Sequence, residues 1–225
     1  MGAGRRIALN FHGLGAPHAG VEAGERPFWL TPAEFEGIVE RVAARPDRER
    51  FLFTFDDGNA SDLIAVEVLA RHGFSGRFYV LTGRLGEAHY LATDDLRRLR
   101  GDGMTIGLHG RDHLDWRTLD DAQLDAETSG ARRELADLLG APVDEVAIPF
   151  GAYDRRVIAR LRRQGFARIL TSDRGAFRPH ERIWARNTVR RDTAGEEPAH
   201  VLESDGSALT RLRRMGSRTV RRYVR

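Results

Sequence analysis

Four residues of this 225-residue sequence have side chains whose types and spacing could hold a metal ion. Asp56 and Asp57 directly follow the apolar run 51–55, and His109 and His113 lie four residues apart later in the chain. One helical turn or a tight loop can direct two imidazoles at this spacing toward one cation, and a carboxylate would supply a third ligand. Two histidines and one aspartate leave coordination positions open for water and substrate, which is typical of a catalytic metal site.

Each half of this pattern also has a purely structural interpretation. Two carboxylates before Gly58 are typical of a turn that ends a strand and caps the helix expected from Asp62. Two histidines four residues apart also occur on the solvated faces of helices. We favour the metal site because a carboxylate at one strand end occurs together with a histidine pair at another.

Cysteine is absent from the sequence, which excludes disulfides and thiolate metal sites. Any metal must therefore be held by histidine, aspartate or glutamate. We expect a divalent ion, zinc, with cobalt or nickel as alternatives.

Charge is unevenly distributed along the chain. There are 36 basic residues, all arginine, and 33 acidic residues, for a net charge of +3. Seven arginines lie in residues 211–225, where there is no acid, so 29 arginines face 33 acids in the rest of the chain. Binding of nucleic acid would require a basic stripe on the folded body, so we do not expect it.

The basic segment is expected to lie outside the catalytic domain. We place the domain at residues 1–206 and a basic tail at residues 207–225, which could contact an anionic membrane surface. A solvated end, or a last helix paired with acids of the body, is the alternative. The five-residue apolar run at 7–11 is too short for a signal peptide or a membrane span. We therefore expect a cytoplasmic protein with peripheral membrane contact.

Short apolar runs alternate with amphipathic stretches along the chain. Strand alternating with helix predicts parallel strands, and about seven repeats without a dinucleotide fingerprint favour a (β/α) barrel over a doubly wound open sheet. A capping box at Thr31 and Glu34 begins the first helix. The expected strands are 7–11, 51–55, 77–81, 104–108, 146–148, 168–171 and 183–189. The expected helices are 32–44, 62–72, one capped by Thr93 that runs to 100, 121–139 and 154–164.

Several of these strands end in a residue that can do chemistry. His12 follows the first strand, Asp56 and Asp57 follow the second, and His109 follows the fourth. The carboxyl ends of the strands of a parallel barrel lie on one face, where such barrels place their active sites. The barrel would therefore bring these distant residues together.

Two motifs resemble those of a known family. Residues 54–58 (TFDDG) are similar to the first motif of the polysaccharide deacetylases, also called the NodB-homology or carbohydrate esterase family 4 domain. Residues 107–113 (GLHGRDH) resemble their His-x-x-x-His second motif, although Gly110 stands where serine or threonine is usual. The resemblance runs from about residue 7 to residue 189.

The resemblance implies a fold and a set of roles. The family fold is a distorted (β/α) barrel of NodB-homology type. Asp56 would be the general base, and Asp57, His109 and His113 would be the metal ligands.

Two departures from the family pattern resemble one of its branches. The third motif usually starts with an arginine, where this sequence has Ala147, and the late Leu-x-x-His that supplies the general acid is not found. Both features resemble the poly-N-acetylglucosamine deacetylases with a permuted barrel, in which the acid histidine lies on the first strand. His12 fits that position, and we predict that Arg186 replaces the missing arginine.

Three residues are candidates for contact with a substrate. Pro149 and Phe150 follow the fifth expected strand, and Trp116 follows the second motif. Apolar rings suit the faces of sugars, so we expect these residues to bind or orient the substrate. Packing in the protein core is the alternative for each.

Together these features predict metal-dependent removal of an acetyl group from an N-acetylated amino sugar, in a glycan or in a lipid-linked or nucleotide-linked saccharide. Asp56 would accept a proton from water, and His12 would protonate the leaving amine. A related C–N hydrolase or an O-acetyl esterase would use the same site. A non-catalytic carbohydrate-binding barrel is the third possibility, but binding alone needs no second carboxylate such as Asp56.

Overall fold

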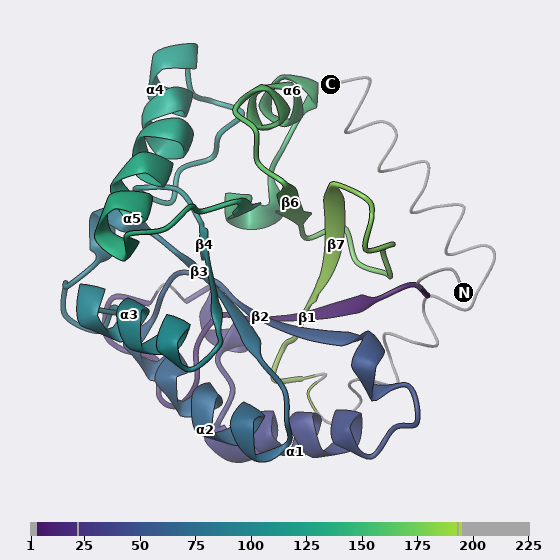
Figure 1. Cartoon of the computed structure of the whole chain (residues 1–225). Coiled ribbons are helices and arrows are strands. Elements are labelled where there is room, and N and C mark those ends of the chain that lie inside the picture. The colour runs from purple at the N-terminus through teal and green to yellow at the C-terminus, as the bar shows by residue number, and fades with distance from the viewer. Residues whose placement is uncertain (1–3, 22, 193, 195–225) are drawn as a thin grey trace.

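Seven strands of the computed structural model, which describes residues 4–21, 23–192 and 194, close into a parallel barrel (Figure 1). Each strand pairs with the next along the chain, and the last returns to pair with the first. This closure confirms the predicted barrel and excludes the open sheet. The strands are β1 (Ile7–Phe11), β2 (Phe51–Phe55), β3 (Gly76–Val80), β4 (Thr105–Leu108), β5 (Glu145–Ala147), β6 (Arg168–Thr171) and β7 (Ile183–Thr188).

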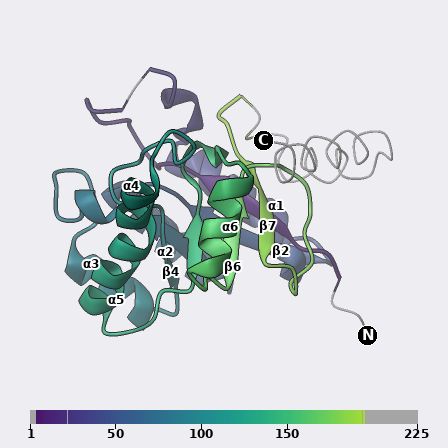
Figure 2. The same ribbon diagram turned by 90° about the horizontal axis from the view of Figure 1, so that it is seen from above.

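Helices cover the outside of the barrel. In Figure 1, α1 and α2 lie together on the side opposite α6, and Figure 2 shows α3, α4 and α5 grouped on one flank. The helices are α1 (Pro32–Ala43), α2 (Ile64–Arg71), α3 (Thr93–Gly101), α4 (Asp121–Asp125), α5 (Ala131–Leu139) and α6 (Arg155–Arg163). Short turns of 3₁₀ helix are η1 (Arg26–Phe28), η2 (Arg48–Arg50), η3 (Ala60–Leu63), η4 (Thr82–Arg84) and η6 (Pro149–Gly151), and η5 (Ala126–Gly130) is a π-helical turn.

The helix ends follow local sequence signals with small differences. The capping box at Thr31 is confirmed, because the Glu34 amide donates to Thr31 Oγ1 at 3.2 Å and a Glu34 carboxylate oxygen accepts from the Thr31 amide at 2.6 Å. Helix α3 is capped one residue earlier than expected, at Ala92 rather than Thr93, because the Ala92 amide donates to the Asp95 carboxylate. The helix predicted over residues 121–139 is interrupted by the π-helical turn η5.

The strands alternate between two environments. Odd-numbered side chains of β1 and β2, such as Leu9, Phe11 and Phe53, belong to the large core between barrel and helices. The interior of the barrel holds a smaller cluster, in which Phe177 and Trp184 stack with ring centroids 4.5 Å apart. Even-numbered positions nearer the carboxyl ends of β1, β2 and β7 are polar and buried, and these positions lead to the site described next: Asn10, Thr54 and Arg186.

Candidate active site

The aspartate and histidine motifs meet at the carboxyl ends of β2 and β4. Asp57 Oδ1 lies 3.4 Å from His109 Nε2 and 3.5 Å from His113 Nε2. Two ligand atoms that each lie about 2.0–2.1 Å from a tetrahedral zinc ion are roughly 3.3–3.4 Å apart. Asp57 Oδ1 is also buried without a hydrogen-bond partner among the described residues, as expected of an oxygen that binds a cation. The three residues therefore fit a divalent metal site.

The next strand orients the imidazole of His109. Its Nδ1 lies 2.9 Å from the backbone carbonyl of Ala147, which assigns the ring proton to Nδ1 and leaves Nε2 to face Asp57. Burial acts to lower the pKa of His109, but the negative charges of Asp56 and Asp57 outweigh burial and raise it. Burial and the charge of His109 lower the pKa of His113 to about 4. His113 is therefore a neutral imidazole near pH 7, with a lone pair for a cation.

Three residues of the site have a left-handed backbone conformation. The φ angle is 72° at Asp57, 57° at His113 and 57° at Phe150. Non-glycine residues adopt this region rarely, at a cost of order 1–3 kcal/mol each, and such residues cluster at functional sites. The surrounding fold thus holds these three residues in a backbone conformation that they adopt rarely.

Buried polar residues of β1 and β7 hold Asp56. Arg186 donates from Nη1 to Oδ1 at 2.6 Å and from Nη2 to Oδ2 at 2.8 Å. Asn10 donates to Oδ2 at 2.9 Å and accepts from Arg186 at 2.8 Å and from the Thr54 hydroxyl at 2.7 Å. All four side chains are buried, so this network fixes the direction of the Asp56 carboxylate.

The same network determines the charge of Asp56. Burial is the largest influence and acts to raise the pKa of Asp56, because it disfavours the carboxylate. The charges of Arg186 and His109 together with the Arg186 hydrogen bonds outweigh burial and hold the pKa well below its usual value. Asp56 is therefore a carboxylate at neutral pH, the form that can accept a proton.

His12 lies beside Asp56. Its Nε2 is 3.8 Å from Asp56 Oδ2, which is also 4.0 Å from His109 Nε2. Burial lowers the pKa of His12, whereas the charges of Asp57 and Asp56 oppose that shift. The side chain keeps 24% of its surface exposed and packs near the ring of Phe28, 5.3 Å between centroids. His12 thus faces the same cavity as His109 and His113.

A cavity of about 400 Å³ lies over these residues. Phe150 forms one wall, with 61% of its surface exposed and its ring 4.2 Å from that of His113. Pro149 is buried and begins the 3₁₀ turn η6 that presents Phe150. The cavity is lined by His12, Asp56, His109, His113, Ser172 and Arg174, among others.

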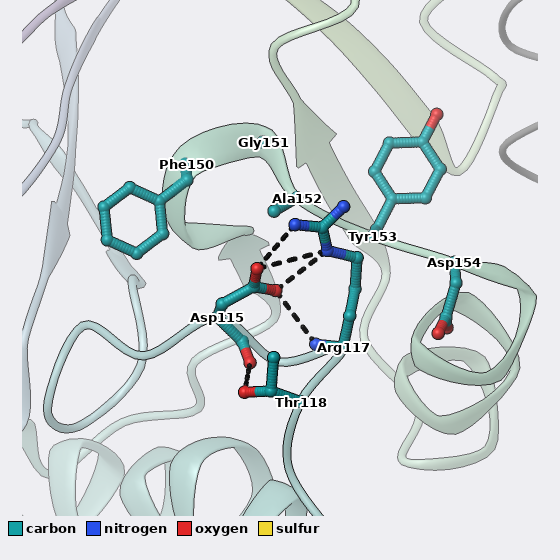
Figure 3. A pocket seen from close by; sticks show the side chains of 8 residues that line it. All are labelled: Asp115, Arg117, Thr118, Phe150, Gly151, Ala152, Tyr153 and Asp154. Atoms are coloured by element: carbon teal, nitrogen blue, oxygen red, sulfur yellow. Dashed lines mark hydrogen bonds and ion pairs between the residues drawn. The ribbon is translucent and has the colours of Figure 1, made fainter.

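Phe150 also borders a second, open cavity of about 570 Å³ (Figure 3). The Asp115 carboxylate and the Arg117 guanidinium form an ion pair there, with Arg117 Nε 2.9 Å from Asp115 Oδ1. Tyr153 and Asp154 line the far side. Because Phe150 and Gly151 line both cavities, the two are neighbours across the η6 turn.

The expectation that Trp116 forms a sugar-binding wall is wrong. Its side chain has no exposed surface and belongs to the main hydrophobic core. The indole N–H donates to Glu127 at 3.2 Å, so the one polar atom of the ring is also used within the protein. Burial of a ring this large leaves no face for a sugar.

Two buried residues of the site were not identified from the sequence. Asn10 joins Asp56, Thr54 and Arg186, and a polar residue at an interior position of a buried strand was the available signal. Glu127 accepts hydrogen bonds from the loop that carries His113, but nothing in the sequence distinguishes it from other acidic helix residues.

Comparison with known proteins places this geometry in a family. The sequence model of the polysaccharide deacetylases matches residues 43–169, more than half of the chain. The chain belongs to the polysaccharide deacetylase family. YxkH of Bacillus subtilis, provisionally named a polysaccharide deacetylase, is 24% identical over 164 residues, covering 72% of this chain. The match spans 58% of the length of that relative.

Several solved structures share the fold. A polysaccharide deacetylase from Bacillus cereus superposes with a TM-score of 0.75 at 20% identity, over 89% of this chain and 69% of that one. The Streptococcus pyogenes deacetylase PplD, solved with acetate, gives 0.76 at 16% identity, over 88% and 98%. IcaB from Ammonifex degensii gives 0.72 at 20% identity, over 89% and 98%. These likenesses confirm the deacetylase-type barrel.

Within the described residues, no helix is long and apolar enough to cross a membrane.

Proposed function

We propose that this polysaccharide deacetylase family member is a metal-dependent hydrolase that removes the acetyl group from an N-acetylated amino sugar. The observation that carries the proposal is the convergence of Asp57, His109 and His113 beside a second, ionised carboxylate, Asp56. A structural metal site would be closed by protein ligands, whereas three ligands leave room for water and substrate.

Asp57, His109 and His113 would hold the metal, zinc by preference, with cobalt or nickel as substitutes. When bound, a divalent cation polarises a carbonyl and lowers the pKa of water. Asp56 lies next to these ligands as a carboxylate and accepts the proton of the attacking water. Arg186 keeps Asp56 ionised and directed through its two hydrogen bonds, and this contact supports the prediction that Arg186 replaces the missing motif arginine.

His12 supplies the second proton transfer. An amine leaves an amide poorly unless its nitrogen is protonated, so the reaction needs an acid as well as a base. His12 lines the same cavity and is partly exposed; burial lowers its pKa, and the charges of Asp57 and Asp56 oppose that shift. The products are acetate and a free amino sugar.

The cavity walls indicate where the sugar would lie. Phe150 presents an exposed ring beside His113, and such rings suit the apolar faces of pyranoses. Pro149 acts indirectly, by fixing the turn on which Phe150 sits. Because Phe150 lines both cavities, a glycan bound at its ring could extend into the second cavity, where Asp115 and Arg117 offer charged groups to sugar hydroxyls.

Two alternatives use the same residues in other ways. An O-acetyl esterase or a related C–N hydrolase needs the same base and metal ligands. A non-catalytic carbohydrate-binding barrel would need the exposed ring of Phe150 but not Asp56. The buried network that keeps Asp56 charged favours catalysis over binding alone.

Acetate release from an N-acetylated chitooligosaccharide tests the proposal. A chelator should abolish turnover, and zinc or cobalt should restore it. Asp56→Asn should retain bound metal and lose roughly 10²–10⁴-fold in rate, the usual contribution of a positioned base, whereas His113→Ala should lose most of the metal. Normal turnover by Asp56→Asn would contradict its role as base. Acetate from O-acetyl substrates alone would indicate the esterase.

A further inference from the structure

The metal-ligand candidate His113 lies in the loop between β4 and α4, and that loop is held from two sides. On one side, the amides of Thr82 and Gly83 donate to the carbonyls of Gly110 and Arg111, at 3.1 and 3.0 Å. These bonds fix the carbonyls of the loop but leave its amide groups to find other acceptors.

The acceptor on the other side is the carboxylate of Glu127. Its Oε2 accepts from the Arg111 amide at 3.2 Å, and its Oε1 accepts from the Asp112 amide at 2.9 Å. The Trp116 indole N–H also donates to Oε2, at 3.2 Å. The Glu127 side chain thus bonds to the loop on both sides of His113, at Arg111 and Asp112 before it and at Trp116 after it.

Glu127 is placed for this contact by a departure from regular helix. It lies in the π-helical turn η5, between α4 and α5, and is only 3% exposed. A π-helical turn inserts an extra residue and changes the direction of the side chains on it, and such turns are frequent at functional sites. In this turn a charged side chain is buried rather than solvated.

The loop is shaped to receive that carboxylate. Gly110 has a φ angle of +98°, and a Cβ atom added there would lie 2.7 Å from Glu127 Oε2. A side chain at this position would therefore collide with the carboxylate as well as strain the backbone. Gly110, Trp116 and the π-helical turn all accommodate Glu127.

We propose that Glu127 is a positioning residue that fixes the loop of His113 so that its imidazole meets Asp57 and His109. The proposal rests on the proposed function only in that this cluster is taken to bind a divalent cation. Glu127 acts through the backbone of the loop, since its carboxylate bonds to amides and an indole rather than to an imidazole.

The test compares Glu127→Gln and Glu127→Ala with Thr128→Ala. Thr128 is the matched control, because it is buried in the same turn and its hydroxyl bonds to Leu124 and Gln164 rather than to the loop. Two measurements are made on full-length protein: hydrogen exchange of the Arg111 and Asp112 amides without metal, and binding of Co²⁺ followed by its visible absorption spectrum.

In both Glu127 variants the Arg111 and Asp112 amides should exchange faster. Both variants should also bind Co²⁺ about 10- to 100-fold more weakly, the usual effect of losing a contact that orients a metal ligand. Their Co²⁺ absorption spectrum should be altered. Thr128→Ala should lower the melting temperature but keep the Co²⁺ affinity and spectrum. If Glu127→Ala fails to fold, Glu127→Gln decides, because it keeps the volume and loses the charge.

Unchanged amide exchange or unchanged Co²⁺ affinity in the Glu127 variants would overturn the proposal, as would an equal loss of affinity in Thr128→Ala. Failure of the wild-type protein to bind Co²⁺ would instead refute the proposed function. In that case the amide exchange of the metal-free protein still decides whether Glu127 fixes the loop.

Discussion

At the scale of single residues, the site pairs a carboxylate that is kept charged with the histidine that we propose as the proton donor. Asp56 is bound by Arg186 and Asn10, whereas His12 Nδ1 is buried without a hydrogen-bond partner among the described residues. The difference suits their proposed roles. The base needs a fixed direction and charge, and the proposed acid turns its other ring nitrogen, Nε2, toward Asp56, which lines the same cavity.

His12→Ala should therefore impair catalysis selectively. We expect retained Co²⁺ binding and a rate on the N-acetyl substrate lowered by roughly 10²–10⁴-fold. The loss should be much smaller on an activated acetyl ester, because a good leaving group needs no protonation. His72→Ala, at the end of α2, is the control and should alter neither rate. Equal losses on amide and ester would mean that His12 binds or supports rather than protonates.

At the scale of elements, β7 closes the barrel by pairing with β1 and places the Arg186 guanidinium beside Asp56. Arg186 and Asp56 are both almost fully buried and bonded through two parallel hydrogen bonds. Truncating one partner of a buried ion pair leaves an uncompensated charge and costs about 3–5 kcal/mol. The ion pair therefore contributes to the stability of the fold as well as to the site.

Arg186→Met should lower the free energy of unfolding by about that amount, 3–5 kcal/mol, near pH 7. Arg77→Met is the control, since it removes the partly exposed pair with Glu145. The depressed pKa of Asp56 means that its stabilisation is present above the unfolded pKa of about 3.9 and is lost as pH falls below it. The difference in the free energy of unfolding between wild type and Arg186→Met, measured by urea unfolding, should accordingly become smaller below pH 4. A difference that does not change with pH would assign the loss to packing.

A second buried acid lies in the turn before α2. Asp62 has no exposed surface, and neither of its carboxylate oxygens has a hydrogen-bond partner among the described residues. Burial, followed by the charges of Asp57 and Asp56, raises its pKa well above the usual value. The folded protein therefore holds Asp62 as the neutral acid over a range of pH in which the unfolded chain ionises it.

Asp62→Asn should consequently stabilise the metal-free protein at neutral pH. An acid with a raised folded pKa binds more protons in the folded state, so the wild type loses stability as pH rises from about 4 toward that pKa. The variant lacks this dependence, and its melting temperature should exceed that of wild type by a margin that grows between pH 4 and pH 7. A constant or inverted margin would show that Asp62 is ionised and stabilised in the fold.

Sequence patterns located most elements but not all of their contacts. Strands β1, β2 and β6 match the expected runs, because short, largely buried segments with apolar residues between polar turns have few other placements. The π-helical turn was not predicted, since it depends on the tertiary contacts of Glu127 rather than on propensity. Trp116 was assigned to the wrong environment because an aromatic residue near a motif can equally pack in the core.

The clustering of the candidate metal ligands was predicted from the sequence, but the hydrogen-bond partners of Asp56 were not. Clustering of Asp57, His109 and His113 followed from one argument, that parallel strands end on one face. The partners of Asp56 could not be read from local sequence. They depend on the register in which β1 pairs with β2 and with β7, and that register places Asn10 and Arg186 behind the carboxylate.

At the scale of the whole molecule, the division into a domain at 1–206 and a tail at 207–225 stays a prediction, because residues 195–225 lie outside the described residues. The prediction rests on charge. Seven arginines in residues 211–225 face no acid in their own segment. Near an anionic leaflet each basic residue contributes on the order of 1 kcal/mol, so a few in contact would hold the protein reversibly. Peripheral contact with an anionic membrane is the hypothesis that follows.

A variant that ends at Ser207 tests this hypothesis. It should stay folded and active on a soluble substrate, yet lose the binding to vesicles with anionic lipid that the full-length protein shows in a flotation assay. Vesicles of neutral lipid are the control. Binding of the full-length protein should fade as salt rises, because the Debye length falls to about 3 Å near 1 M salt. If the full-length protein ignores anionic vesicles at low salt, the membrane hypothesis is wrong and a solvated end is favoured. If the shortened variant unfolds, the arginines act within the domain instead, by pairing with its acidic residues.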